Sequence, residues 1–220
     1  MSHPLRLWIA IPAKPLAEGK SRLSPVLGEA ERVALTRRLV QRTLGVVSSV
    51  AGIAGIVVVS RDPEILALAE GAGALALWEE ETNGQTGENG PEWGLNRAIR
   101  QAAGVVLGEG GDALLFLPTD LPLLQVEDIH TLVLTWDQRP HCAVIAPSQN
   151  GGTNALLLCP PDAITPAFGL GSFARHLELA QQQGLAVAVV ESPALAWDVD
   201  IPEEWGKLLM VAKSPNHPIT

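Results

Sequence analysis

Residues 5–11 read LRLWIAI, a short and nearly continuous apolar run that stops at Pro12 and Pro15. A run of this kind is typical of a strand that is buried on both faces of a sheet. The same pattern returns at residues 56–59 (IVVV) and 113–117 (ALLFL). These three runs predict the centre of a sheet that helices cover on both sides.

Segments with helical spacing lie between the apolar runs. Residues 29–47 are apolar at Val33, Leu39, Val40 and Leu44, with arginines between them. Similar patterns predict helices over residues 63–70, 94–107, 126–136, 172–183 and 202–211, and strands over residues 74–78, 142–146, 155–159 and 186–190. This alternation predicts an α/β fold, with a mostly parallel central sheet, helices on both faces and right-handed crossovers.

The composition excludes several classes of protein. Of the 220 residues, 47% are hydrophobic, which is enough for a packed core and excludes a mainly disordered chain. The net charge of −9 disfavours binding to nucleic acid or to an anionic membrane surface. No apolar stretch reaches about 18 residues, and the early run is too interrupted for a signal peptide. We therefore predict a cytoplasmic protein that binds neither nucleic acid nor membrane.

The chain shows no internal repeat and no interdomain linker. We predict one domain over residues 1–212, followed by a loose C-terminal tail at residues 213–220 that contains two prolines. Cys142 and Cys159 fall in predicted strands, so we expect buried thiols rather than a disulfide framework. The oligomeric state stays open, and a homodimer is one of the options.

Ligands of open α/β sheets bind beyond the carboxyl ends of the strands, so the residues after each predicted strand are candidates. After the first run come residues 12–23, PAKPLAEGKSRL, with the cations Lys14, Lys20 and Arg22. Lysine supplies point charge and arginine a planar pair of donors, so this loop could gather a polyphosphate. The alternative is a solvated basic loop, because both the Walker A and the dinucleotide glycine patterns are missing.

Acidic residues follow the third run and recur near the C-terminus. Asp120, in PTDLP, follows a buried strand directly. A carboxylate at such a place lowers the stability of the fold unless it is solvated or paired, and a divalent cation is one natural partner. Asp198 and Asp200 would point to the same side of an extended chain. With Asp120 they would give the oxygen ligands that magnesium prefers. The alternatives are a turn or cap at Asp120 and a cap of the last helix at Asp200.

Glycines precede two further polar positions. In Gly169-Leu170-Gly171-Ser172, the start of a helix could bind an anion, although plain N-capping by Ser172 is the alternative. Residues 151–154, GGTN, offer small-residue access to a ligand, and their alternative is a hairpin turn. The apolar stripe of the following helix runs through residues 173, 177 and 180, so we expect His176 on the surface.

Taken together, these segments resemble the 2-phospho-L-lactate guanylyltransferase family of deazaflavin coenzyme (coenzyme F-420) biosynthesis, which includes phosphoenolpyruvate guanylyltransferases. The resemblance covers almost the whole chain and implies a nucleotidyltransferase fold of the glycosyltransferase-A type. One departure is the acidic stretch ENGPEW at residues 88–93, on the nucleotide side. The matching stretches are IPAKPLAEGKSRL (11–23), GLNRAI (94–99), FLPTDLPLL (116–124), GGTNALL (151–157), FGLGSFARH (168–176) and LAWDVDIPEE (195–204).

The resemblance implies an enzyme that transfers GMP from GTP to the phosphate of a small phospho-acid and releases pyrophosphate. It implies a site in which Mg²⁺ binds Asp120, Asp198 and Asp200, the phospho-acid binds Thr153, Gly169 and Ser172, and the GTP phosphates bind Lys14, Lys20 and Arg22, with Asn96 near the nucleotide. Lys14, Lys20 and Asp120 would then be the catalytic residues.

Two other functions stay open from the sequence. One is another nucleotidyltransferase or a nucleotide-sugar glycosyltransferase of the same fold, although a typical sugar transferase would carry D-x-D where this chain has Thr119-Asp120-Leu121. The other is a non-catalytic nucleotide-binding subunit. The acid also stays open among 2-phospho-L-lactate, phosphoenolpyruvate and 3-phosphoglycerate.

Overall fold

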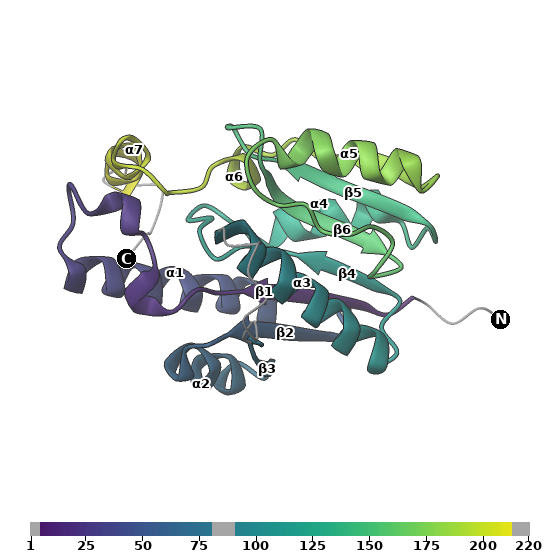
Figure 1. The fold of residues 1–220 in the computed structure, drawn as a ribbon, viewed down its shortest axis with the longest axis horizontal. Helices are drawn as coiled ribbons and strands as arrows, with labels where there is room; N and C mark the ends of the chain where they lie inside the picture. Colours follow the sequence, from purple (N-terminus) through teal and green to yellow (C-terminus); the bar gives the residue numbers. More distant parts are fainter. Residues whose placement is uncertain (1–4, 81–90, 213–220) are drawn as a thin grey trace.

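The computed structural model describes residues 5–80 and 91–212, which are arranged around one seven-stranded sheet (Figure 1). Its strands are β1 (Leu7–Pro12), β2 (Gly55–Ser60), β3 (Leu75–Trp78), β4 (Ala113–Phe116), β5 (Cys142–Pro147), β6 (Thr153–Cys159) and β7 (Ala186–Val189). Their order in the sheet is β3-β2-β1-β4-β6-β5-β7. Only β6 runs antiparallel to its neighbours, β4 and β5, so the prediction of a mostly parallel sheet is confirmed.

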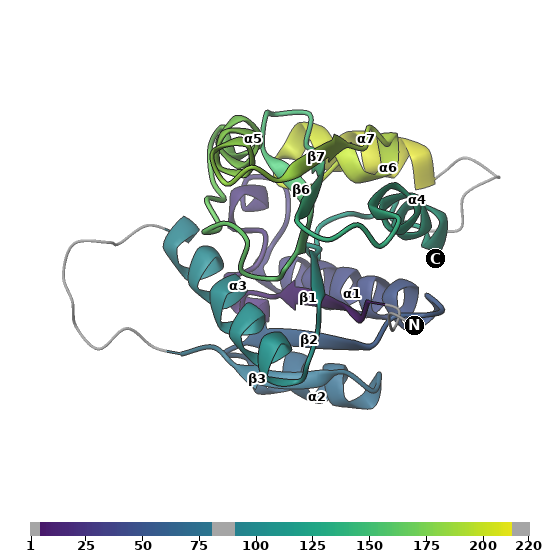
Figure 2. The same ribbon diagram turned by 90° about the vertical axis from the view of Figure 1, so that its right-hand side faces the viewer.

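Helices cover both faces of the sheet, as the side view in Figure 2 shows. They are α1 (Glu29–Ser48), α2 (Pro63–Gly71), α3 (Pro91–Gly108), α4 (Val126–Trp136), α5 (Ser172–Gln182), α6 (Pro193–Ala196) and α7 (Pro202–Ala212). Side chains from α1, α2 and α4 pack on one face, and those from α3 and α5 pack on the other. The predicted helices are thus present, while the short helix α6 was not predicted and α3 starts before residue 94.

Strand β1 is buried on both of its faces. Leu7, Ile9 and Ile11 join the core under α1, α2 and α4, whereas Trp8 and Ala10 face α3. Successive side chains of a strand point to opposite faces, so only an uninterrupted apolar run fits this central position. Among the described residues, no helix combines the length and the apolar character that crossing a bilayer requires.

Several strand ends meet at one edge of the sheet, namely the edge formed by the carboxyl ends of its parallel strands. The parallel strands β1, β4 and β5 all end there, and the antiparallel strand β6 begins there with Thr153, which pairs with Pro147 at the end of β5. The loop after β1 and the residues after β4 therefore lie at the same edge as the turn between β5 and β6. This edge is the one at which ligands bind in open α/β sheets.

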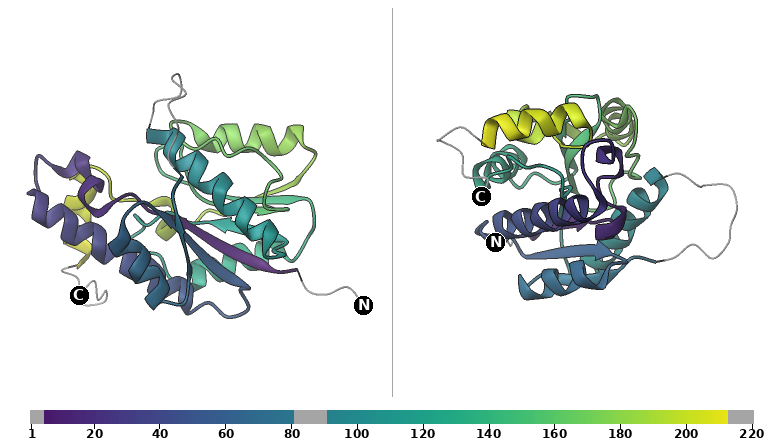
Figure 3. Two further views of the ribbon diagram at one scale, coloured as in Figure 1. Left: turned by 60° about the horizontal axis from the view of Figure 1, so that its bottom comes forward. Right: turned by 90° about the vertical axis from the view of Figure 1, so that its left-hand side faces the viewer.

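A small apolar cluster outside the sheet joins the loop after β1 to the C-terminal helix α7. Its buried members are Leu23, Trp197, Val199 and Leu208. Leu23 ends the second of two short 3₁₀ turns in the loop, and Val199 precedes α7. Both views in Figure 3 show the loop beside α7. The cluster thus holds the basic loop against the acidic segment at residues 198–200.

The predicted buried thiols are confirmed, and the predicted tail lies outside the described residues. Cys142 and Cys159 are both free and buried, on neighbouring positions of β5 and β6. Burial raises the pKa of the Cys142 thiol to about 11, so it stays protonated near neutral pH. Residues 213–220 and residues 81–90, which include part of the acidic stretch before α3, are not described.

The close contact between Gly19 and α1 gives a test of the loop's packing. A Cβ at Gly19 would overlap the Thr36 side chain of α1, so Gly19→Ala should lower the free energy of unfolding by about 1–3 kcal/mol. Gly45 is the matched control: it is exposed in α1 with open space at its Cβ, and Gly45→Ala should raise that free energy by about 0.5–1 kcal/mol. Urea denaturation measures both, and an unchanged Gly19→Ala variant would show that the loop shifts without cost.

Candidate active site

Three carboxylates from two distant segments meet at the ligand-binding edge of the sheet. One oxygen from each of Asp120, Asp198 and Asp200 lies within 4.8 Å of the other two. The Val199 N–H donates to the Asp120 carbonyl oxygen at 3.2 Å, which ties the acidic segment to the end of β4. Val199 is buried in the small apolar cluster, while Asp198 and Asp200 are partly exposed on either side of it. The structure therefore brings together the three predicted acidic residues.

The Lys20 side chain lies between two of these carboxylates. Its Nζ is 2.9 Å from Oδ1 of Asp200 and 3.4 Å from Oδ2 of Asp120, and only 8% of the side chain is exposed. Its backbone has a left-handed φ of 53°, which is strained for a residue other than glycine. Burial by itself would lower the pKa of Lys20, but the two carboxylates outweigh burial and raise it. Lys20 therefore remains charged.

One lysine does not neutralise the acidic cluster. Burial, together with the charges of Asp120 and Asp200, raises the pKa of Asp198 to about 6. Burial also acts to raise the pKa of Asp200. The charge of Lys20, with smaller contributions from Arg22 and Lys14, outweighs burial, so the pKa of Asp200 is lowered. The exposed Lys14 and Arg22 side chains thus lie near enough to act on this cluster. The predicted basic loop therefore lies beside the predicted acidic residues.

The acidic cluster has the properties of a divalent cation site. All of its donors are carboxylate oxygens, the ligands that magnesium and manganese prefer. Three carboxylates lie beside one buried ammonium, so their charge is incompletely balanced, and burial together with the neighbouring carboxylates raises the pKa of Asp198. A bound cation would remove this imbalance, so the residues present fit a metal ion.

A second, buried polar cluster lies between the β5–β6 turn and the start of α5. It consists of Thr153, Ser172 and His176 and is called the Thr153 cluster below. Ser172 Oγ is 3.3 Å from Thr153 Oγ1, and that oxygen is 2.9 Å from Nδ1 of His176. The Phe173 N–H donates to the Gly151 carbonyl at 3.2 Å, which fixes the first turn of α5 against the turn between the strands. The structure thus brings the predicted residues Thr153 and Ser172 together, and Gly169 lies three residues before Ser172, whose N–H donates to its carbonyl.

The expectation that His176 is a surface residue is wrong. Its side chain is fully buried, its Nε2 accepts a hydrogen bond from the Ala167 N–H at 3.0 Å, and its ring meets the Phe168 ring edge-on. The inward stripe of α5 runs through Ser172, His176 and Ala180, with four-residue spacing. The apolar residues Phe173 and Leu177, on which the expectation rested, lie one position beyond Ser172 and His176, and one residue turns a helix by about 100°.

Asn96 lies in α3 and contacts the segment that leads to Gly169. Its Nδ2 donates to the Phe168 carbonyl at 3.2 Å, and its Oδ1 accepts from the Phe168 N–H at 2.8 Å. Both polar ends of this buried amide therefore fix the backbone beside the Thr153 cluster. The predicted role of Asn96 near the nucleotide stays a prediction.

Hydrogen bonds that the sequence analysis missed connect the two clusters. Asn154, next to Thr153, donates from Nδ2 to the Leu195 carbonyl at 2.8 Å, just before the acidic segment. The buried Glu204 accepts from the backbone N–H groups of Asp200 and Ile201, at 2.7 and 3.1 Å. Glu204 thus ties the backbone at the end of the acidic segment to the first turn of α7. The sequence signal was an acidic residue in the first turn of a helix.

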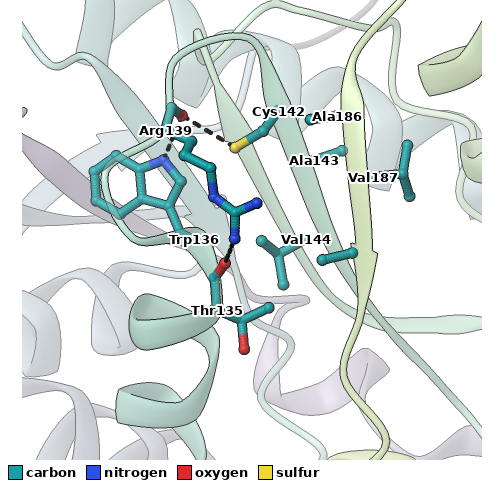
Figure 4. A pocket seen from close by; sticks show the side chains of 9 residues that line it. Thr135, Trp136, Arg139, Cys142, Ala143, Val144, Ala186 and Val187 are labelled. Carbon is teal, nitrogen blue, oxygen red and sulfur yellow. Dashed lines mark hydrogen bonds between the residues drawn. The ribbon is translucent and has the colours of Figure 1, made fainter.

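The pocket drawn in Figure 4 belongs to a different part of the molecule. It lies between α4 and strands β5 and β7, with Thr135, Arg139, Cys142 and Val187 among its lining residues. The Arg139 side chain donates to the Thr135 carbonyl at 2.8 Å across it. None of its lining residues contributes to the acidic or the Thr153 cluster, so we assign it to packing at the opposite edge of the sheet.

The fold is that of nucleotidyltransferases. CMP:2-keto-3-deoxy-manno-octonic acid synthetase, solved with CTP, shares this fold with a TM-score of 0.59 at 16% identity, covering 95% of this chain and 100% of that one. Glucosyl-3-phosphoglycerate synthase from Mycobacterium tuberculosis, solved with Mn²⁺ and UDP, gives a TM-score of 0.55 at 13% identity, covering 85% and 70%. These likenesses establish the nucleotidyltransferase fold of the glycosyltransferase-A type.

The family model described as "Guanylyl transferase CofC like" matches residues 7–216, and the chain belongs to that family. It is 38% identical to the phosphoenolpyruvate guanylyltransferase of Rubrobacter xylanophilus, covering 93% of this chain and 94% of that protein. It is 33% identical to the 2-phospho-L-lactate guanylyltransferase of Methanothermobacter thermautotrophicus, covering 91% and 82%. With the 3-phospho-D-glycerate guanylyltransferase of Colwellia psychrerythraea it shares 30% identity, covering 96% and 94%.

The raised pKa of Asp198 predicts the pH dependence of metal-free stability. The unfolded chain releases the Asp198 proton near pH 4 and the folded chain near pH 6, so this residue's contribution to stability falls as the pH rises from about 4 to 6. With EDTA present, Asp198→Asn should therefore be more stable than wild type by about 1–2 kcal/mol at pH 7.5, after allowing for solvent screening, and about equal at pH 4. Urea denaturation at both pH values measures this difference. A difference that is the same at both would contradict the charge crowding inferred here.

Proposed function

We propose that this protein transfers GMP from GTP to the phosphate of a small phospho-acid, with release of pyrophosphate, in deazaflavin coenzyme biosynthesis. The observation that carries the proposal is the convergence of Asp120, Asp198 and Asp200, two of which pair with the charged Lys20, in a chain of a guanylyltransferase family. We propose phosphoenolpyruvate as the acid, because relatives with that substrate in their names are 38% and 36% identical over at least 90% of this chain.

We propose that Asp120, Asp198 and Asp200 hold Mg²⁺. The all-oxygen donor set and the incompletely balanced charge support this assignment. When bound, magnesium supplies positive charge that offsets the repulsion between the triphosphate and the phospho-acid. Lys20, held between two of the carboxylates, adds a fixed cation at the same place.

The basic loop would receive the triphosphate. The charges of Lys14 and Arg22 act on Asp200, which supports a place for both side chains at the rim of the acidic cluster. There they can bind phosphate oxygens and stabilise the negative charge that develops on the leaving pyrophosphate. Lys20 would share this role from its buried position.

The Thr153 cluster would receive the phospho-acid. Thr153 and Ser172 present hydroxyl groups beside the first turn of α5, and the positive end of the helix dipole there favours an anion. Gly169 has a φ of 126°, a backbone conformation that glycine adopts readily, just before this turn. The link from Asn154 to Leu195 supports a position for the acid next to the carboxylates.

The chemical step needs no general base. The second pKa of a phosphate monoester is about 6, so the nucleophilic oxygen is already ionised near neutral pH. That oxygen forms a bond to the α-phosphorus of GTP while the bond between the α-phosphorus and the bridging oxygen to the β-phosphorus breaks, and pyrophosphate leaves. The protein's task is to hold two anions in line and to balance their charge.

A pyrophosphate-release assay over several acids and nucleotides tests this function. We expect release with GTP and phosphoenolpyruvate in Mg²⁺, and little release with ATP, CTP or UTP. Preference for 2-phospho-L-lactate or 3-phosphoglycerate would change the acid and keep the reaction. No pyrophosphate with any pair would contradict the proposal, and would favour a sugar transferase or a non-catalytic subunit.

Asp120→Asn removes one charge from the proposed metal site. We expect kcat to fall by about 100-fold or more, because the charge that positions the cation is lost, while the circular dichroism spectrum is unchanged. Asp137→Asn is the matched control, because Asp137 ends α4 in an exposed left-handed position that asparagine also adopts. Near-normal turnover of Asp120→Asn in saturating Mg²⁺ would remove Asp120 from the metal site.

Ser172→Ala removes one hydroxyl from the proposed acid site and leaves the start of α5 in place. We expect the KM for phosphoenolpyruvate to rise by about 10-fold, the size of one lost hydrogen bond to a charged group, while the KM for GTP changes less than about 2-fold. Steady-state kinetics with each substrate varied in turn measures both constants. An unchanged KM for the acid, or a larger change for GTP, would place Ser172 outside the acid site.

A further inference from the structure

The hydrogen atoms of the Thr153 cluster can be counted, starting from His176. Its Nε2 lies 3.0 Å from the Ala167 backbone nitrogen. A backbone N–H can only donate, so Nε2 accepts and carries no hydrogen of its own. Burial, with a contribution from the Arg175 charge, lowers the pKa of His176 to about 4, so the ring is neutral near neutral pH. Its one N–H is therefore on Nδ1.

The position of this hydrogen decides how the two hydroxyl groups are used. His176 Nδ1 lies 2.9 Å from Thr153 Oγ1 and donates to it. Ser172 Oγ is 3.3 Å from the same oxygen. The two hydroxyls carry two hydrogens, and only one of them can lie between the two oxygens. Among the described residues, no hydrogen bond of this cluster supplies an acceptor for the second hydroxyl hydrogen.

A buried hydroxyl hydrogen without an acceptor is unfavourable, so it indicates a missing acceptor. Thr153 and Ser172 are 7% and 1% exposed, so bulk water reaches them little. With the hydrogen on Nε2 instead, Nδ1 would accept from Thr153 and use up the spare hydrogen. The contact between Ala167 and Nε2 excludes that arrangement.

We propose that His176 is a positioning residue: by donating to Thr153, it makes the Thr153–Ser172 pair offer a hydroxyl hydrogen to an anionic oxygen of the phospho-acid. The identity of that ligand rests on the function proposed above. His176 itself does not touch the acid and acts only through Thr153.

The surroundings hold the imidazole in the orientation that this role requires. The ring centroid lies 4.6 Å from that of Phe168, which in turn packs 4.3 Å from Phe116 of β4. Asn96 fixes the Phe168 backbone through both ends of its amide. A flip of the ring would break the bonds to Ala167 and Thr153 together, so this packing and the two hydrogen bonds support the same orientation.

Two variants of His176 separate the donor from the rest of the ring. His176→Gln can keep an acceptor near the Nε2 position for Ala167 but loses the donor to Thr153. His176→Asn can place an amide N–H near the Nδ1 position. We expect His176→Gln to raise the KM for phosphoenolpyruvate by about 5–20-fold, with kcat and the KM for GTP within about 2-fold of wild type. His176→Asn should restore most of the affinity for the acid.

A double-mutant cycle with Thr153→Val tests whether His176 acts through Thr153. Valine keeps the shape of threonine and removes the hydroxyl. In the Thr153→Val background, His176→Gln should cause no further rise in the KM for the acid. If the two effects multiply instead, or if His176→Gln affects the acid and GTP equally, His176 has a structural role and the proposal is wrong.

Nitrogen-15 NMR of the histidine side chains decides the hydrogen position without any turnover. We expect the His176 ring to be neutral from pH 5 to pH 9, with the hydrogen on Nδ1. A hydrogen on Nε2 in the folded wild-type protein would overturn the proposal, whichever acid is the substrate and whether or not the variants fold. A hydrogen on Nδ1 together with no turnover of any phospho-acid would instead refute the proposed function, while the assignment of the hydrogen to Nδ1 and its bond to Thr153 would stand.

Discussion

The ion pairs of the buried Lys20 ammonium are the interactions on which the site depends. This side chain joins Asp120, 100 residues further along the chain, to Asp200, 180 residues further along. Without it, carboxylates crowded within 4.8 Å would repel one another, with only the exposed Lys14 and Arg22 side chains to offset their charge. The left-handed backbone at Lys20 and the burial of its charge are both unfavourable, and the carboxylates and the apolar cluster around Leu23 and Val199 offset that cost.

The sheet topology places the two halves of the site side by side. Parallel strands bring the basic loop after β1 and Asp120 after β4 to the same edge, and the antiparallel β6 brings Thr153 there from the opposite direction. In the part of the site formed by Asp120, Asp198 and Asp200, the excess of negative charge favours a bound cation. In the part formed by Thr153, Ser172 and the start of α5, two hydroxyl groups and the helix start favour a bound anion.

The sequence predicted those features that depend on local pattern. The apolar run of β1 predicted a strand buried on both faces, and the alternation around Val199 predicted that Asp198 and Asp200 point to one site. It could not predict the place of β6 between β4 and β5, because strand order depends on contacts between distant segments. The left-handed Lys20 carries no local signal either, and His176 was misplaced because its stripe was read one residue off.

The anomalous diffraction of manganese in crystals grown with Mn²⁺ and GTP is the measurement that tests the central claim most directly. The account predicts a strong peak within about 2.5 Å of carboxylate oxygens from Asp120 and from Asp198 or Asp200, with triphosphate oxygens at the same ion. A map with no peak among these carboxylates, or with a peak bound by phosphate oxygens alone, would contradict it.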